Sequence, residues 1–165
     1  MGSILHLHRI PAVGGDTMFA SMYAAYDALS DPIKALIADM KAWNESAPVH
    51  RDRFGAKGKL RDGEDVFPQA LHPIVRTHPV TGRKGLFVNE NFTTRIEGLK
   101  KHESDAILRM LYEHIATPEF HCRFRWREKS VAFWDNRCAQ HRTVWDYHPE
   151  VRHGYRVTVA GDRPF

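Results

Sequence analysis

The residues with the most evident chemistry lie in the last third of the chain. His141 closes the segment 134–141, and Arg152 and Arg156 follow it by eleven and fifteen residues. A neutral imidazole is a common metal ligand, and a guanidinium binds a carboxylate through two parallel hydrogen bonds. We expect His141 at the end of an apolar strand, where this set can supply one metal ligand and two anion anchors to a single cavity.

Each of these residues also has an ordinary structural interpretation. A lone histidine is more often a structural residue than a ligand, and two arginines can form a solvated surface pair. Arg152 and Arg156 are an even number of residues apart, so on one strand they point to the same face. There they repel each other unless anions or carboxylates neutralise them. Thr17 can simply cap a helix, so no single residue decides the function.

Other potential metal ligands lie in less favourable places. The literal His-X-Asp of this sequence, His50-Arg51-Asp52, falls in a long polar stretch, where a structural role is favoured over a ligand role. His6 and His8 share one face of a predicted strand and can bind a metal ion adventitiously, but neither supplies a carboxylate. A carboxylate partner for His141 is therefore not evident from spacing.

Length and composition are typical of one soluble, globular, cytoplasmic domain. The chain has 165 residues, 42% of them hydrophobic and 27% charged, and two cysteines that form no disulfide framework. No apolar run approaches the ~20 residues that span a bilayer, so we expect no membrane partner. The net charge of +4 comes from scattered residues, which favours small anionic ligands over nucleic acid. A homo-oligomer stays open.

The pattern of apolar residues predicts several short strands with helices in two places. We expect strands at 2–11, 120–126, 131–134 and 155–159, a hairpin at 74–88, helices at 17–29, 32–40 and 104–115, and a long loop at 45–70. Within the second helix, Ile33, Leu36, Ile37 and Met40 should form one buried face. The predicted fold class is mainly β with flanking helices (α+β), as a sandwich or barrel.

Four blocks in this order resemble a known family. They are residues 14–17 (GGDT), 87–96 (FVNENFTTRI), 134–141 (WDNRCAQH) and 156–162 (RVTVAGD). Together they resemble the taurine dioxygenase and chlorophenoxyacetate dioxygenase family of Fe(II)/2-oxoglutarate-dependent oxygenases, over nearly the whole chain. The resemblance implies an incomplete double-stranded β-helix (jelly-roll, clavaminate synthase-like), with residues 1–165 as the C-terminal part of a single dioxygenase domain.

The resemblance also implies a role for individual residues. His141 matches the distal histidine of the 2-His-1-carboxylate iron site. Arg152 matches the arginine that binds the distal carboxylate of 2-oxoglutarate, assisted by Thr17. Arg156 matches an arginine that holds an anionic substrate, and Phe92 matches an aromatic wall of the substrate pocket. Trp126 and Trp134 match tryptophans near the iron, or are ordinary core residues.

The activity implied by the resemblance is hydroxylation of a small, anionic compound, a sulfonate or a carboxylate. Dioxygen is consumed, and 2-oxoglutarate is converted to succinate and CO2. In the family a His-X-Asp motif lies just upstream of the strand that begins here at Gly2. We therefore expect the chain alone to bind iron poorly, to turn over little, and to associate through an open sheet edge. Two alternatives stay open: a catalytically dead remnant that binds small anions or a protein partner, and an iron-independent structural jelly-roll.

Overall fold

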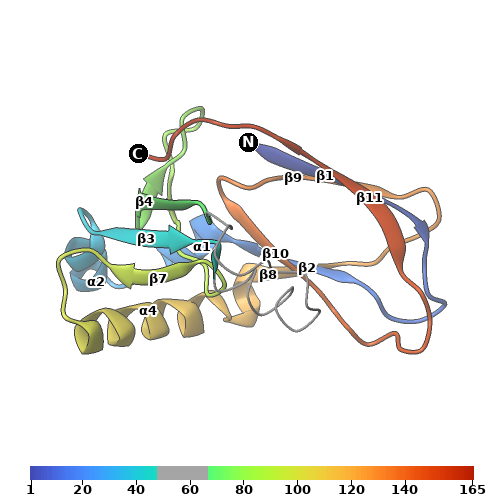
Figure 1. The fold of residues 1–165 in the computed structure, drawn as a ribbon, viewed down its shortest axis with the longest axis horizontal. Helices are drawn as coiled ribbons and strands as arrows, with labels where there is room; N and C mark the ends of the chain where they lie inside the picture. Colours follow the sequence, from blue (N-terminus) through green and yellow to red (C-terminus); the bar gives the residue numbers. More distant parts are fainter. Residues whose placement is uncertain (48–66) are drawn as a thin grey trace.

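The computed structural model describes residues 1–47 and 67–165. In one part of the molecule two three-stranded antiparallel sheets face each other (Figure 1). The first sheet has the order β11-β1-β9, with β1 at Gly2–Arg9, β9 at Val131–Asp135 and β11 at His153–Val159. The second has the order β10-β2-β8, with β2 at Thr17–Ser21, β8 at His121–Phe124 and β10 at Ala139–Thr143.

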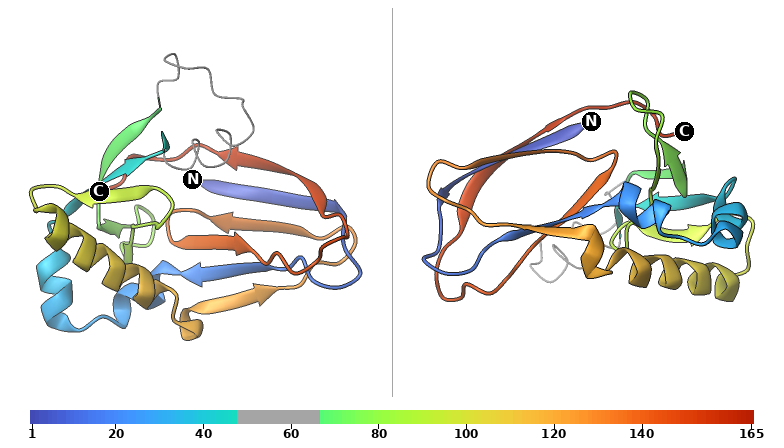
Figure 2. Two further views of the ribbon diagram at one scale, coloured as in Figure 1. Left: turned by 60° about the horizontal axis from the view of Figure 1, so that its bottom comes forward. Right: turned by 180° about the vertical axis from the view of Figure 1, so that it is seen from behind.

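The other part of the molecule holds the helices and two smaller sheets. A three-stranded sheet has the order β4-β3-β7, formed by Gln69–Pro73, Lys41–Glu45 and Thr93–Ile96. A hairpin joins β5 (Val75–Thr77) to β6 (Lys84–Leu86). The helices are α1 (Met22–Asp27), α2 (Asp31–Ile37) and α4 (Lys101–Ile115), followed by a 3-10 turn at Pro118–Phe120. Both views in Figure 2 show α4 beside β7, away from the paired sheets.

Each part has its own hydrophobic core. Between the two facing sheets lie Leu7, Trp126, Ala132 and Trp134, all buried. This follows from the alternation of β1, which turns Leu5 and Leu7 inward and the exposed His6 outward. A larger core under the helices is formed by apolar residues of α1, α4 and the smaller sheets. The chain crosses between the two facing sheets repeatedly, so residues far apart in sequence line the same interior.

Several expected elements are confirmed. Strand 2–11, the hairpin within 74–88, the helix that ends at Ile115 and the three late strands are all present, although several bounds differ. The mainly β fold with few helices is confirmed as well. In the described part of the chain, no helix is both long and apolar enough to cross a membrane.

The predicted helix over 17–29 is wrong in its first third. Residues Thr17–Ser21 form β2, which pairs with both β10 and β8, and α1 begins only at Met22. Pairing on both sides outweighs the weak helical spacing of this segment. Ser21 marks the change, because its side chain accepts a hydrogen bond from the backbone N–H of Ala24 and caps the helix.

The expected buried face of the second helix is partly wrong. Ile37 is fully buried, and Ile33 and Met40 pack against the core. Leu36, however, is 48% exposed. Because α2 ends at Ile37, the expected helical face also does not extend to Met40. Of the expected loop over 45–70, residues 48–66 lie outside the described part, and β4 begins at Gln69.

Candidate active site

A glycine turn between β1 and β2 positions the first predicted site residue. Gly14 and Gly15 both have positive φ angles, 82° and 71°, which side chains rarely adopt. The turn is held because Asp146 Oδ1 accepts a hydrogen bond of 2.8 Å from the Gly15 N–H. A side chain on Gly15 would also contact Arg152, since an added Cβ would lie 3.2 Å from Arg152 Cδ. The turn thus brings β2 and Arg152 together.

Arg152 and Thr17 form one hydrogen-bonded unit. Arg152 Nε donates to the Gly15 carbonyl at 2.7 Å, and its Nη2 donates to Thr17 Oγ1 at 3.1 Å. Trp126 Nε1 also donates to Thr17 Oγ1, at 3.0 Å, and the Trp126 ring lies 5.6 Å from the guanidinium. Thr17 is only 1% exposed. Because its oxygen already accepts two hydrogen bonds, its own proton is available for donation to an anion.

The charge of Arg152 has no neutralising partner at close range within residues 1–47 and 67–165. No carboxylate of the described residues lies within 4.0 Å of its guanidinium, and no acceptor among them binds Nη1. Burial lowers the pKa of Arg152, although Tyr147 and Asp16 act in the opposite direction. A half-buried guanidinium with a free edge is a strong site for a carboxylate.

His141 lies in the middle of β10, opposite Phe19 of β2, so its predicted place at the end of the apolar strand is wrong. Its ring packs against Trp134, with centroids 4.6 Å apart. Although the residue is reached by solvent, neighbouring protein atoms partly desolvate the ring. This desolvation lowers the pKa of His141, and the positive charge of Arg156 lowers it further. The neutral imidazole keeps a lone pair for a metal ion.

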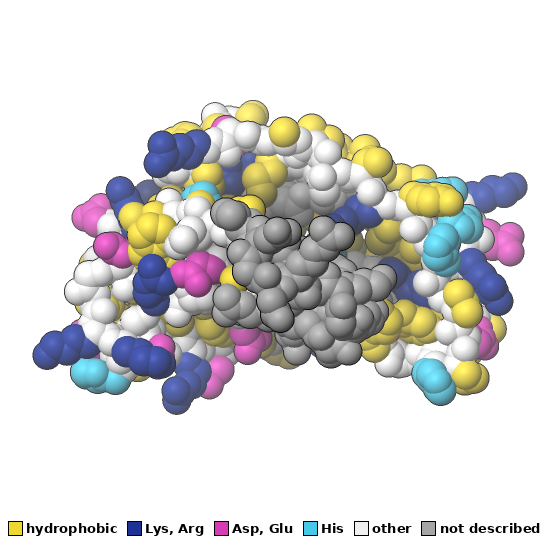
Figure 3. Space-filling view, viewed as in Figure 1, with side chains coloured by type: hydrophobic (Ala, Val, Ile, Leu, Met, Phe, Trp, Pro, Cys, Tyr) yellow, Lys and Arg dark blue, Asp and Glu magenta, His cyan; other side chains and the backbone are white. Residues whose placement is uncertain are grey.

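A cavity of about 900 Å³ brings three of the predicted residues together. His141, Arg156 and Phe92 all line it. Figure 3 shows a recess above and to the right of the centre of this face, with basic side chains in it. Thr17 and Arg152 do not line this cavity. They lie next to it, because Thr17 pairs with Thr143, two residues beyond His141 on β10.

An amide network next to His141 was missed from sequence. Asn89 Nδ2 donates to Gln140 Oε1 at 2.9 Å, and Gln140 Nε2 donates to the Val88 carbonyl. The Asn89 N–H in turn donates to Thr93 Oγ1 at 2.9 Å. These bonds connect β10 to the loop that carries Phe92. Amides at irregular spacing give no periodic signal, so only the resemblance pointed to this segment.

Further ligands for a metal at His141 are not found among the described residues. The group of three potential ligands in residues 1–47 and 67–165 is His78, Asp135 and Cys138, which does not include His141. The His-X-Asp at residues 50–52 lies outside the described part of the chain. The described site therefore supplies one imidazole, two arginines and a threonine hydroxyl.

Known proteins are similar to this chain over nearly its whole length. Residues 1–158 match the model of the taurine catabolism dioxygenase TauD, TfdA family. The chain is 44% identical over 160 residues to a Schizosaccharomyces pombe protein described as a candidate alpha-ketoglutarate-dependent sulfonate dioxygenase. That match covers 94% of this chain and 39% of the relative. Alpha-ketoglutarate is another name for 2-oxoglutarate.

Two solved structures share both the fold and substantial identity. A taurine dioxygenase from Burkholderia xenovorans has a TM-score of 0.85 at 36% identity, over 99% of this chain and 53% of that one. A protein named AAD-2, solved with Mn(II) and N-oxalylglycine, has a TM-score of 0.85 at 36% identity, over 99% and 64%. The chain thus spans less than two thirds of each of these proteins. It belongs to the taurine catabolism dioxygenase TauD, TfdA family.

Proposed function

We propose that this chain forms the 2-oxoglutarate-binding and substrate-binding part of an Fe(II)-dependent dioxygenase. Its two facing sheets correspond to an incomplete double-stranded β-helix, and residues 1–165 to the C-terminal part of a single dioxygenase domain. The enzyme hydroxylates a small organic anion, a sulfonate or a carboxylate. Family membership supports the reaction class, and the named relatives support the kind of substrate.

The observation that carries this proposal is the guanidinium of Arg152, for which the described part of the chain offers no carboxylate partner. Its Nε and Nη2 are held by Gly15 and Thr17, which leaves the Nη1 edge in a fixed orientation. Removing such a group from water without a counter-ion costs free energy, and a bound carboxylate offsets this desolvation cost. The Thr17 hydroxyl can donate a further hydrogen bond to the same anion. This geometry suits the distal carboxylate of 2-oxoglutarate.

His141 is the described residue that would hold the iron. Its lowered pKa keeps the imidazole neutral, as a metal ligand must be. When bound, Fe(II) supplies the oxidative chemistry that couples decarboxylation of 2-oxoglutarate to hydroxylation. One imidazole holds Fe(II) weakly, since non-haem iron oxygenases of this kind use two histidines and a carboxylate. The described residues therefore fit a part of the metal site.

Arg156 and Phe92 are suited to the substrate. Both line the cavity that also contains His141. An arginine near the metal ligand can hold a sulfonate or carboxylate, while the aromatic ring packs against the apolar body of the substrate. Burial lowers the pKa of His141, and the positive charge of Arg156 lowers it further. This arrangement orients an anionic substrate beside the metal position.

A turnover assay tests this function. Because the chain spans about half of its relatives' length, the assay needs a protein that also carries the rest of the domain. Succinate is measured with Fe(II), ascorbate and 2-oxoglutarate, with alkylsulfonates, aryloxy acids or matched neutral alcohols as substrates. We expect anionic substrates to be preferred, and Arg156→Ala to lose hydroxylated product while 2-oxoglutarate affinity stays largely intact. Preference for neutral substrates would refute the role of Arg156.

A second candidate is a non-catalytic anion-binding protein. The observation that favours it is the lack, among the described residues, of further ligands beside His141. Such a protein would bind 2-oxoglutarate through Arg152 but would release no succinate with any of the substrates tested. Succinate release that depends on Fe(II) excludes this candidate.

A further inference from the structure

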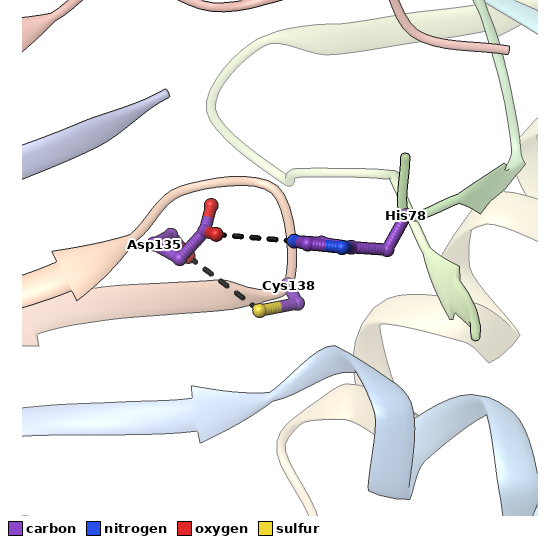
Figure 4. Close-up of side chains that lie close together, drawn as sticks. All are labelled: His78, Asp135 and Cys138. Atoms are coloured by element: carbon purple, nitrogen blue, oxygen red, sulfur yellow. Dashed lines mark hydrogen bonds and ion pairs between the residues drawn. The ribbon is translucent and has the colours of Figure 1, made fainter. Parts of the chain in front are cut away.

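A cluster of potential metal ligands lies outside the candidate active site, but its hydrogen bonds exclude a metal. His78, Asp135 and Cys138 present ligand atoms within 4.8 Å of one another, and Figure 4 shows His78 directed at Asp135. His78 Nδ1 accepts backbone N–H bonds from Val80 and Thr81, at 3.3 and 3.2 Å. A neutral imidazole that accepts at Nδ1 carries its proton on Nε2. The atom facing the cluster is therefore a donor and has no free lone pair.

The other two members of this cluster, Asp135 and Cys138, are also unsuited to bind a metal ion. Arg137 donates to Asp135 from its backbone N–H, Nε and Nη2, at 2.7 to 3.0 Å. Burial raises the pKa of Cys138, which keeps the sulfur protonated. The cluster is thus a hydrogen-bonded junction between β9, β10 and the hairpin β5–β6.

The outer face of the first sheet carries a different histidine group. His8 Nε2 and His153 Nδ1 are joined by a hydrogen bond of 2.8 Å, between the neighbouring strands β1 and β11. The strand register shifts between Leu7 and Arg9, so His8 is the extra residue of a bulge, a feature that redirects side chains. Both histidines are exposed. Figure 3 shows histidine side chains gathered with hydrophobic ones at the end of the molecule where β1 and β11 lie in Figure 1.

The separation of these two nitrogens matches the spacing of adjacent ligands on one metal ion. Imidazole nitrogens bind at about 2.0–2.1 Å, so two of them at a right angle are about 2.9 Å apart, and about 3.4 Å apart in a tetrahedron. The observed 2.8 Å fits the right angle. Right-angle nitrogen ligands are typical of Cu(II) and Ni(II), which hold imidazoles in square-planar or tetragonal geometry.

We propose that His8 and His153 form a second, surface metal site, for a divalent transition metal ion such as Cu(II) or Ni(II). In the metal-free chain the two nitrogens share a hydrogen bond, in which one donates its proton to the other. A shift of that proton to the other nitrogen of its ring frees both facing lone pairs for a metal ion. Among the described residues no hydrogen-bond partner is found for His8 Nδ1 or His153 Nε2, so each can carry its proton there. Water completes the coordination. Tyr155 stacks on the His8 ring, with centroids 5.1 Å apart, and fixes its plane.

A metal ion at this site would join β11, which carries Arg156 and directly follows Arg152, to its neighbour β1. His153 begins β11, directly after Arg152 and three residues before Arg156. A coordinate bond between β1 and β11 restrains this edge strand where the register is irregular. Binding to the folded chain alone also raises its stability by mass action. The site thus links metal occupancy to the order of β11 without touching the candidate active site.

Calorimetric titration of the untagged 165-residue chain with Cu2+, then Ni2+ and Zn2+, tests the proposal. We expect one saturable Cu2+ site that binds Zn2+ more weakly, and a higher melting temperature with Cu2+. His8→Asn and His153→Asn should each weaken Cu2+ binding by at least ~tenfold, the lower limit for loss of even an outer-shell partner. His102→Asn, at an exposed histidine of α4, is the matched control and should change nothing.

Two further measurements keep the result unambiguous. Melting curves without metal show whether each variant is folded, and His153→Gln replaces His153→Asn if that variant is not. His141→Asn separates this site from the candidate iron site, because Cu2+ affinity should survive it. The proposal is overturned if Cu2+ does not bind saturably, if the His8 and His153 variants bind it like the parent, or if only His141→Asn abolishes binding.

Discussion

At the scale of single residues, the protonation state of His141 decides whether its imidazole can bind a metal ion. Its ring is partly desolvated and lies near the positive charge of Arg156, and both effects lower its pKa. A protonated imidazole cannot bind a metal ion, so the lowered pKa extends the pH range in which His141 is a competent ligand. Arg156 therefore has two roles: it attracts an anion and keeps its neighbour neutral.

Removing the Arg156 charge should raise the pKa of His141 toward 6.5, its ordinary value. The pH titration of the His141 ring proton by NMR, in the parent chain and in Arg156→Ala, measures this. Arg125→Ala serves as control, because Arg125 is exposed, follows the end of β8 and does not line the cavity. Equal pKa values in parent and Arg156→Ala would show that desolvation alone accounts for the shift.

The same shift fixes the sign of one pH effect on stability. The folded chain protonates His141 less readily than the unfolded chain, whose value is near 6.5. The contribution of this residue is therefore fully present above pH 6.5 and is lost as the pH falls through the lowered folded value.

The sequence named candidate site residues, but their surroundings were not predictable from it. The resemblance named His141, Arg156 and Phe92, and the structure brings them to one cavity. The hydrogen bonds that orient Arg152 come from Gly15 and Thr17, more than 130 residues away in sequence. Such contacts depend on tertiary packing, which spacing does not encode.

At the scale of elements, the glycine turn between β1 and β2 sets the position of Arg152. Gly15 combines a positive φ with a close approach to the Arg152 side chain. Gly82 also has a positive φ, 69°, but an added Cβ there would meet nothing within 4 Å. A side chain at Gly82 would therefore cause backbone strain alone, whereas a side chain at Gly15 would cause backbone strain and also contact Arg152.

Gly15→Ala should destabilise the chain and displace Arg152, whereas Gly82→Ala should cost only the backbone term of about 1–2 kcal/mol. We expect Gly15→Ala to exceed Gly82→Ala in the loss of unfolding free energy measured with denaturant. Only Gly15→Ala should also weaken 2-oxoglutarate binding. Equal effects of the two substitutions on both quantities would contradict the proposed contact.

The amide network next to His141 gives a second prediction at this scale. Gln140→Leu leaves the Asn89 amide and the Val88 carbonyl without their partner, which typically costs about 1–3 kcal/mol per unpaired buried group. Urea unfolding should show a loss of this size. Asn91→Ala, at an exposed residue of the same loop, should stay near the parent. If Gln140→Leu leaves the free energy of unfolding unchanged, water molecules replace these hydrogen bonds in the variant.

Long, apolar or strongly patterned elements were predictable, and short strands of mixed polarity without a clear alternation were not. Helix α4 runs for 15 residues with a periodic apolar face, and its end was correctly placed at Ile115. Strands β3, β7 and β10 were missed, because each has four or five residues and mixed polarity. Their stability comes from partners elsewhere in the chain: β10 from β2, and both β3 and β7 from each other.

At the scale of the whole molecule, the first sheet presents an apolar outer face. Phe133, Tyr155 and Val157 are 60–71% exposed and come from strands on either side of β1. β11 and β10 each lie at the edge of their sheet, so backbone groups there are open to a further strand. An exposed apolar face of this kind promotes association.

The isolated chain should therefore associate with itself in a concentration-dependent manner. Sedimentation velocity over a range of concentrations measures this. Val157→Lys, on the outer face of β11, should shift the distribution toward the monomer. Val80→Lys, at a 79% exposed valine in the β5–β6 turn, should not. A parent chain that stays monomeric at high concentration would show that this face needs no partner.

The central claim is that Arg152 and Thr17 build a carboxylate site for 2-oxoglutarate, and the affinity of this chain for 2-oxoglutarate tests it most directly. Chemical-shift titration of the parent chain, Arg152→Ala and the exposed control Arg125→Ala gives the three dissociation constants. Loss of one partner of a buried charge pair costs about 2–5 kcal/mol. We therefore predict saturable binding that is at least ~tenfold weaker in Arg152→Ala and unchanged in Arg125→Ala. Binding of equal strength in the parent and Arg152→Ala, or none in the parent, would contradict the account.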